Sequence, residues 1–288
     1  KGSGGGGVTG GAGGGVLRIN VANQLIVNGT ISCNGGDGVS EASGGSGGSI
    51  WITAKTVSGS GTIRANGGNA QPNYRCGGGG GRVSVYCEEN LFSGTISVAG
   101  GARGPYGGQD GASGTAAIFT PNAENPELND IAVVKSWSFT AFDGPVTFGQ
   151  VDLSGNDTAD SSVSIYSSVT ADTITVEQAN ISVGDNCTIS AETFTIGDAT
   201  ASLSPTALLQ ATNFVNSASF VFNGNLNMDV ANFTLDVNST ISADGKGYAR
   251  GEGPGAGVYD ANPTYGSGGG HGGSGGGFDS DTQGGGVY

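Results

Sequence analysis

Hydrophobic and polar residues alternate in three early stretches of the chain. The apolar positions of these stretches are Leu17, Ile19 and Val21; Ile50, Ile52 and Ala54; and Val83, Val85 and Cys87. A period of two with β-branched residues is typical of a strand that buries one face. The pattern therefore predicts three strands, each with one side against a core.

A short element follows each predicted strand and repeats. Gly29-Thr-Ile-Ser-Cys-Asn-Gly-Gly36 returns as Gly61-Thr-Ile-Arg-Ala-Asn-Gly-Gly68 and again as Gly94-Thr-Ile-Ser-Val-Ala-Gly-Gly101. A glycine-rich insert comes next in each case, over residues 35–49, 67–82 and 100–114. Without its insert, each repeat is about 20 residues long, and internal repeats of fixed length indicate a repeat architecture.

The middle of the chain repeats at this shorter length. Ile174, Phe194, Phe214 and Phe233 occupy corresponding positions, about 20 residues apart. A strand-rich unit of this size is too short for a propeller blade of about 40 residues, but it fits one coil of a solenoid. We therefore predict an all-β fold, a parallel β-solenoid (β-helix) of about eight rungs of about 20 residues.

This fold implies that equivalent residues of successive rungs form inward columns. The expected columns are Ile31, Ile63 and Ile96, and Cys33, Ala65 and Val98. The alternative is an antiparallel β-sandwich, which does not require a fixed register of this kind.

Glycine divides the chain into three parts. It occupies 59 of 288 positions, but only six of them lie between 116 and 244. We predict solenoid rungs with glycine-rich inserts over 1–115, rungs nearly free of glycine over 116–244, and a glycine-rich tail over 245–288. The tail is expected to pack on the first part or to join the next module. Because the inserts recur at one point of consecutive rungs, we expect an ordered side layer of extended glycine helices; the alternative is a flexible linker.

Charge excludes several partners. Ten Lys and Arg face 24 Asp and Glu, for a formal net charge of −14. No basic patch is available to neutralise phosphates, so we expect no nucleic-acid partner. No apolar stretch approaches the roughly 18 residues of a membrane span, so none is expected.

The four cysteines are candidates for disulfides. Cys33, Cys76, Cys87 and Cys187 do not show zinc-site spacing. An even number of cysteines in an acidic chain rich in Ser, Thr and Asn favours disulfides and an oxidising, extracellular location. Three pairings are possible, and the sequence does not choose among them.

Catalytic and metal sites are poorly supported. His271 is the only histidine, and it lies in a glycine run with no convincing acid or nucleophile to pair with. We therefore expect no enzyme and no cofactor. Asp279 and Asp281 are candidate Ca²⁺ ligands, although calcium needs six to eight oxygens and solvated turn acids are the alternative.

Six Asn-x-Ser/Thr sequons are candidate N-glycosylation sites. They lie at Asn28, Asn156, Asn180, Asn186, Asn232 and Asn238.

Two surface features bear on ligand binding. Trp51 is out of phase with Ile50 and Ile52 and should face away from the core, so Trp51 and Trp137 are the residues to locate for a carbohydrate groove. Threonine pairs of the kind that bind ice occur at residues 173 and 175 and at 193 and 195. The next rung has Asn213 and Val215 at these positions, which breaks the array.

Two segments carry a family resemblance. The run of Gly-Ser-Ile-Trp-Ile, Gly-Thr-Ile, Asn-Gly-Gly and Gly-Gly-Gly-Gly-Gly-Arg-Val-Ser-Val from Gly48 to Val85, and the tail segment from Gly245 to Gly257, resemble glycine-rich solenoid repeats of very large secreted proteins. Such proteins look like adhesins or filament components such as flagellar hairs (mastigonemes), and the resemblance implies no catalytic residues.

The sequence favours a structural role over a catalytic one. The glycine-rich ends look like cuts through one tract, and neither end shows a capping element, which solenoids need in order to stay monomeric. Either a missing flanking segment supplies the caps, or the ends join other copies. We therefore expect an extracellular module whose copies join head to tail as a homopolymer, since exposed strand edges invite stacking. The alternatives are a carbohydrate-binding or adhesive module, with glycans as partners, and an ice-binding protein.

Overall fold

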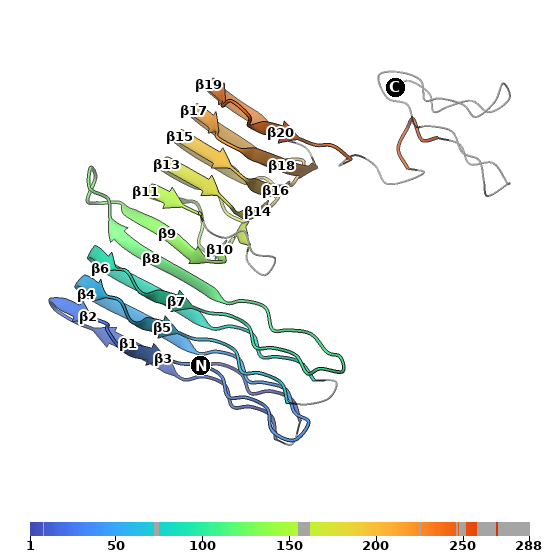
Figure 1. The fold of residues 1–288 in the computed structure, drawn as a ribbon. Helices are drawn as coiled ribbons and strands as arrows, with labels where there is room; N and C mark the ends of the chain where they lie inside the picture. The colour runs from blue at the N-terminus through green and yellow to red at the C-terminus, as the bar shows by residue number, and fades with distance from the viewer. Residues whose placement is uncertain are drawn as a thin grey trace, which may run out of the picture. The chain divides into compact units, whose positions relative to one another are not determined.

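The described part of the chain forms strands, turns and loops, with no helix. A computed structural model describes residues 1–7, 9–71, 75–154, 162–224, 226–245, 247, 252–257 and 269. These residues contain twenty strands and no helix (Figure 1), and hence no helix that could span a membrane. The chain divides into two compact units, Lys1–Ser242 and Ala243–Tyr288, and all the strands lie in the first.

Three sheets make up the strand-bearing unit. In spatial order, the 11-stranded sheet holds β1 (Val16–Asn20), β4 (Ser49–Gly59), β6 (Arg82–Phe92), β8 (Thr115–Pro121), β9 (Asn129–Lys135), β11 (Val146–Asp152), β13 (Val169–Glu177), β15 (Thr188–Gly197), β17 (Leu208–Asn216) and β19 (Met228–Leu235), with β2 (Gln24–Ile26) also beside β4. The six-stranded sheet holds β10 (Trp137–Phe139), β12 (Val163–Ile165), β14 (Asn180–Val183), β16 (Ala199–Leu203), β18 (Ser219–Gly224) and β20 (Thr240–Ser242). The three-stranded sheet holds β3 (Thr30–Ser32), β5 (Thr62–Arg64) and β7 (Thr95–Ser97).

Successive coils pair in parallel and in the register of the sequence repeat. Ile63 pairs with Ile31 on one side and with Ile96 on the other. In the later coils, Phe194 pairs with Ile174 and with Phe214, which in turn pairs with Phe233. The predicted all-β fold with long parallel strands is therefore confirmed, and it is compatible with a β-solenoid. It argues against the antiparallel sandwich.

One strand pair departs from this parallel arrangement. β8 and β9 pair antiparallel, with an irregularity in register between Ala116 and Ala117. The turn between them has no glycine-rich insert, and it is held by Asn122, whose Oδ1 accepts the N–H groups of Glu124 and Asn125 at 3.0 and 2.8 Å. Strand direction therefore reverses here, whereas the repeats had predicted one rung running through both parts. We call strands β1 to β8 the first part and strands β9 to β20 the second part.

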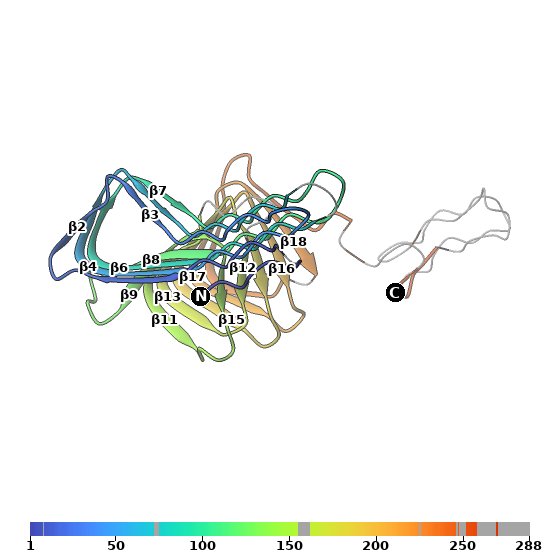
Figure 2. The ribbon, with the colours of Figure 1, turned by 90° about the horizontal axis from the view of Figure 1, so that it is seen from below.

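The reversal gives the unit two hydrophobic cores that share β8. Ala116 and Ile118 contact the core of the first part, whereas Ala117 and Phe119 contact the core of the second part. Figure 2 shows β3 and β7 on one side of β8, and β11 and β13 on the other. Alternate side chains of one strand thus belong to different cores, as the period of two allows.

The glycine-rich segments are hydrogen bonded with a period of three. In residues 43–48, the N–H groups of Ser43 and Ser46 donate to residues 6 and 3, those of Gly44 and Gly47 to residues 76 and 79, and those of Gly45 and Gly48 to residues 36 and 33. One segment therefore bonds to three neighbours in rotation. Three residues per turn is the geometry of an extended polyproline II helix, whose backbone groups all point outward.

Close packing requires glycine along these segments. A Cβ atom on Gly68 would lie 1.9 Å from the backbone oxygen of Gly36, and one on Gly111 would lie 2.0 Å from that of Gly78. Real Cβ contacts are never so short. Backbones can approach this closely only where neither residue carries a side chain.

Candidate functional site

A row of aromatic side chains crosses the outer face of the first part. Trp51 of β4 stacks on Tyr86 of β6 with ring centroids 4.7 Å apart, and Tyr86 stacks on Phe119 of β8 at 4.5 Å. Trp137 of β10 meets Phe119 at 5.7 Å and an interplanar angle of 66°. Four strands thus contribute one ring each. Offset and edge contacts of this kind stabilise by about 0.5–1.5 kcal/mol per pair beyond the buried area.

The row lines a groove at the junction of the two parts. Trp51, Ser84, Tyr86 and Phe119 line it from β4, β6 and β8, and residues 137–140 and Asp143 line it from the start of the second part. We call this the aromatic groove; its volume is about 590 Å³. A second groove of about 380 Å³ shares Trp51 and Ser84 with it. Both volumes fall within the range of about 300–1,000 Å³ that is usual for ligand sites.

The stacking covers both faces of the central ring of the row. Tyr86 has a ring against each of its faces, so only its edge and hydroxyl remain. Burial raises the pKa of this hydroxyl, which therefore stays protonated and can donate a hydrogen bond. Trp51 is 43 % exposed, and its indole N–H donates to Thr53 Oγ1 at 3.2 Å.

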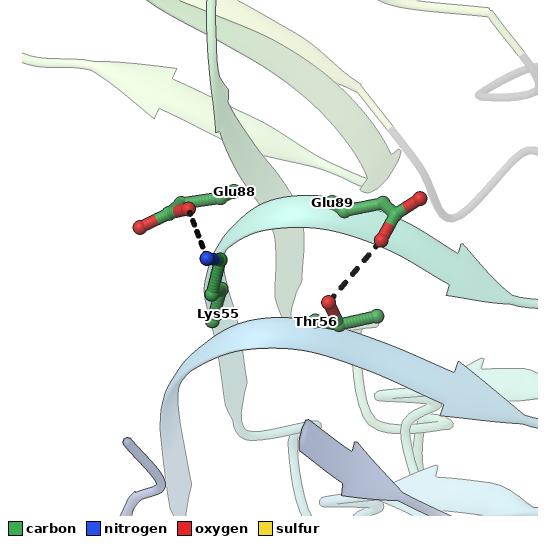
Figure 3. Close-up of polar contacts among 4 residues, drawn as sticks. All are labelled: Lys55, Thr56, Glu88 and Glu89. Carbon is green, nitrogen blue, oxygen red and sulfur yellow. Dashed lines mark hydrogen bonds and ion pairs between the residues drawn. The ribbon is translucent and has the colours of Figure 1, made fainter. Parts of the chain in front are cut away.

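Basic side chains on these strands differ in whether they form an ion pair with an acid. On the same strands but away from the groove, Lys55 Nζ lies 4.0 Å from Glu88 Oε2, and Thr56 Oγ1 donates to Glu89 at 3.2 Å (Figure 3). This exposed ion pair contributes little to stability. By contrast, within the described residues neither Arg18 nor Arg82 forms an ion pair. Arg82 lines both grooves, and the Arg18 guanidinium lies 6.0 Å from the centre of the Trp51 ring.

The last coil leaves an apolar ladder uncovered. Phe194 and Phe214 are fully buried and stack at 5.6 Å, and Phe233 of β19 stacks on Phe214 at 5.2 Å. Phe233 is nevertheless 49 % exposed, and Leu235 and Val237 are exposed beside it. The end of the stack therefore presents to solvent the column that inner coils bury.

The four cysteines are free thiols in the structure, so none of the three possible pairings is formed. Cys76 is exposed, Cys33 is partly buried, and Cys87 and Cys187 are buried. Burial raises the pKa of Cys33 and raises that of Cys87 to about 11; burial, with a smaller contribution from the charge of Asp185, raises that of Cys187. Few thiolates are therefore available at neutral pH for redox or metal chemistry.

The sequons differ in accessibility. Asn28, Asn186, Asn232 and Asn238 are exposed, whereas Asn180 is partly buried in β14. Asn232 also donates from Nδ2 to Asn213 Oδ1 at 3.0 Å on the neighbouring strand. Asn156 lies outside the described residues.

The candidate metal and acid–base residues Asp279, Asp281 and His271 lie outside the described residues. Elsewhere in the described chain, no group of three or more His, Cys, Asp or Glu side chains could hold a metal ion.

The threonine pairs occupy adjacent strands, and their array ends after two coils. Thr193 is in register with Asn213, and Thr195 is in register with Val215. The break expected from the sequence is therefore present, and the face offers no extended threonine array.

Sequence reasoning found part of the aromatic groove. Trp51 faces outward between Ile50 and Ile52 as predicted, and Trp137 lines the same groove. Tyr86 and Phe119 were missed, although Tyr86 alternates with the inward Val85 and Cys87 in the same way as Trp51 does with its neighbours. The remaining wall, residues 137–140 and Asp143, depends on the strand reversal, and the sequence repeats do not predict that reversal.

Comparison of the chain with models of protein families, with curated proteins and with solved structures finds no match. What the chain does must therefore be argued from its own residues.

Proposed function

We propose that this chain is a structural module of an extracellular filament or surface fibre, and that copies join end to end. The observation that carries the proposal is the uncovered ladder at Phe233, because each inner ring of that ladder is buried by the next coil. Another coil placed on β19 would bury Phe233 and Leu235. Burial of apolar area stabilises by roughly 25 cal/mol per Å².

Unpaired strand edges support the same conclusion. Among the described residues, β19 pairs only with β17, β20 only with β18, and β1 and β2 only with β4. An edge strand presents a row of free N–H and C=O groups, which are a template for another strand. Both ends of the strand stack therefore offer backbone hydrogen bonds to a second copy.

The β8–β9 junction suggests how two copies would meet. Strand direction reverses once among the described strands, so β19 runs antiparallel to β1. If copies are related by translation along the stack and β19 of one copy pairs with β1 of the next, the new pair is antiparallel, as β8 and β9 are. The joint between copies would thus repeat a junction that the chain already contains.

The number of coils and the role of the glycine-rich segments are also part of this proposal. About eight coils would form the rod, and the hydrogen-bonded glycine segments would act as a side layer that stiffens its first part. Backbone bonds in three directions resist bending in a way that a single row of strands does not. The extracellular location rests on the composition, and the exposed Asn28, Asn186, Asn232 and Asn238 are accessible to glycosylation.

Electron microscopy and sedimentation of the whole chain test the proposal. The double variant Phe233→Lys/Leu235→Lys places two charges on the uncovered ladder and should convert filaments to single particles. Phe142→Lys is the control, because Phe142 is 99 % exposed in a turn far along the chain from either edge. Wild-type protein that remains monodisperse at high concentration would overturn the proposal, as would filaments that persist in the double variant.

A further inference from the structure

We infer that the aromatic groove binds an acidic glycan, with Arg82 pairing with a carboxylate of the sugar chain. This function differs from end-to-end assembly, because the aromatic groove lies at the β8–β9 junction; only the second groove, beside Arg18, reaches the edge strand β1. Several hydrogen-bond donors that line the groove have no partner within the described chain.

The groove concentrates hydrogen-bond donors that the protein does not use. Ser84 is only 5 % exposed, yet its hydroxyl has no hydrogen-bond partner within the described chain. The same holds for the Tyr86 hydroxyl, the Trp137 indole N–H and the Arg82 guanidinium. None of these four groups is among the buried side-chain atoms that lack a partner in the described chain, so they are open to the solvent of the groove and free to donate to a ligand. Four free donors around one groove indicate a ligand rich in acceptor oxygens.

The covered ring faces decide against a flat stacking platform. Sugars bound mainly by stacking need a free aromatic face, and Tyr86 has none. Trp51, which is 43 % exposed, and Trp137, which meets Phe119 at an angle, are the rings that could contact a sugar ring. Recognition in this groove therefore combines ring contacts with hydrogen bonds and charge.

Local charge selects an acidic ligand. The chain carries a formal charge of −14, yet two arginines with no acid partner in the described structure flank Trp51. The one carboxylate of the groove, Asp143, is engaged by Thr140, whose N–H and Oγ1 donate to it at 2.7 and 2.8 Å. Guanidinium groups bind carboxylates through two parallel hydrogen bonds. A uronic acid offers that carboxylate together with hydroxyls for Ser84 and Tyr86.

The extent of the site fits a chain rather than a single sugar. The aromatic groove and the groove beside Arg18 share Trp51, Arg82 and Ser84. A glycan could therefore pass over Trp51, with Arg18 and Arg82 on either side of the ring. A polyuronate places carboxylates at regular intervals along such a path.

Calorimetry with the full chain tests the inference. The probes are an oligogalacturonate, a neutral cello-oligosaccharide of equal length and a sulfated oligosaccharide. We expect the uronate to bind at least tenfold more tightly than the neutral sugar, with an affinity that falls as salt rises. Arg82→Gln should weaken uronate binding about tenfold, Arg82→Lys less, and Ser84→Ala by a few-fold. Arg64→Gln is the control, because Arg64 lies on β5 outside both grooves and donates to Ser32.

Three results would overturn the inference. Equal binding of the neutral and acidic sugars would remove the role of charge. Equal losses in Arg82→Gln and Arg64→Gln would show general electrostatic attraction. A change of filament assembly in Arg82→Gln, without a change of glycan binding, would show that the occupant is a second copy. Tighter binding of the sulfated sugar than of the uronate would retain an acidic glycan but replace carboxylate with sulfate.

Discussion

Ala116 and Ala117 are consecutive residues of β8, and their fully buried side chains lie in two different cores. A strand in an ordinary solenoid buries one face only. Here both faces of β8 are buried, so the small side chains of Ala116 and Ala117 suit a wall shared by two cores. The strand thereby couples the folding of the first part to that of the second.

Charges placed at these two positions should affect different halves of the unit. Ala116→Asp buries a carboxylate in the first core and Ala117→Asp buries one in the second, at a cost of about 3 kcal/mol or more. Hydrogen exchange should lose protection first in β4 and β6 for Ala116→Asp, and first in β11 and β13 for Ala117→Asp. Ala123→Asp, in the exposed β8–β9 turn, is the matched control and should change little. Identical exchange patterns in the two variants would contradict the two-core description.

Glycine positions that look alike in the sequence should differ in their tolerance of alanine. Gly68→Ala sets a Cβ 1.9 Å from a backbone oxygen, and relief of that clash requires the neighbouring segments to separate. We expect a loss of about 2–3 kcal/mol. Gly29→Ala has no atom within 4 Å of its Cβ and should be neutral or slightly stabilising. Thermal denaturation measures both, and equal tolerance would mean that the segments around Gly68 are not closely packed in solution.

Periodicity predicted the columns of the fold well, because each column depends only on residues one coil apart. Ile63 and Phe214 are examples, and both are fully buried. The reversal at β8–β9 was not predictable in this way, since it depends on the Asn122 turn and on both faces of one strand. The pair Ala116-Ala117 was a visible signal, because two adjacent buried residues break the alternation. The same holds for the aromatic groove. The outward direction of Trp51 was predicted from the alternation of its strand, whereas the wall formed by residues 137–140 and Asp143 depends on the strand reversal and was not predicted.

Thiol labelling distinguishes the free thiols of the structure from the predicted disulfides. Without reductant, iodoacetamide should modify Cys76 in the native protein, because Cys76 is exposed. Cys87 and Cys187 should react only after unfolding because they are buried, and the partly buried Cys33 should react more slowly than Cys76; burial also raises the pKa values of all three thiols. Mass spectrometry counts the labels. A protein that takes up no label even when unfolded has all four cysteines in disulfides, as the sequence predicted.

Alkaline pH should weaken the fold through Cys87. Its pKa rises from 9.0 to about 11 on folding because the thiol is desolvated. Between these values the folded state holds more protons than the unfolded state, so the free energy of unfolding falls as pH rises, by about 3 kcal/mol in all. Cys87→Ala should remove that part of the decline, and Ala54 at the paired position shows that alanine fits the column. Cys76→Ala should keep the decline; equal slopes in both variants would argue against a buried thiol at Cys87.

Asn216 tests whether the last inner coil is complete within one copy. It is fully buried in a column between Ile196 and Leu235. Its Nδ2 donates to the Thr240 carbonyl at 2.9 Å, but Oδ1 has no partner within the described chain. Replacing it by isoleucine removes that unpaired acceptor and continues the aliphatic column, at the loss of one hydrogen bond. We therefore expect Asn216→Ile to stay within about 1 kcal/mol of the wild type in denaturant titrations.

The isosteric variant Asn216→Asp should behave oppositely. It replaces the donor toward Thr240 with an acceptor and leaves either a buried charge or a neutral acid with one unpaired oxygen, so we expect a loss of about 3 kcal/mol or more at neutral pH. Because a protonated carboxyl can donate to the Thr240 carbonyl, acid should restore part of that loss relative to the wild type. If Asn216→Ile is as damaging as Asn216→Asp, then the unpaired Oδ1 is satisfied in solution. An additional coil or a bound water at this end of the stack would then have to supply the donor.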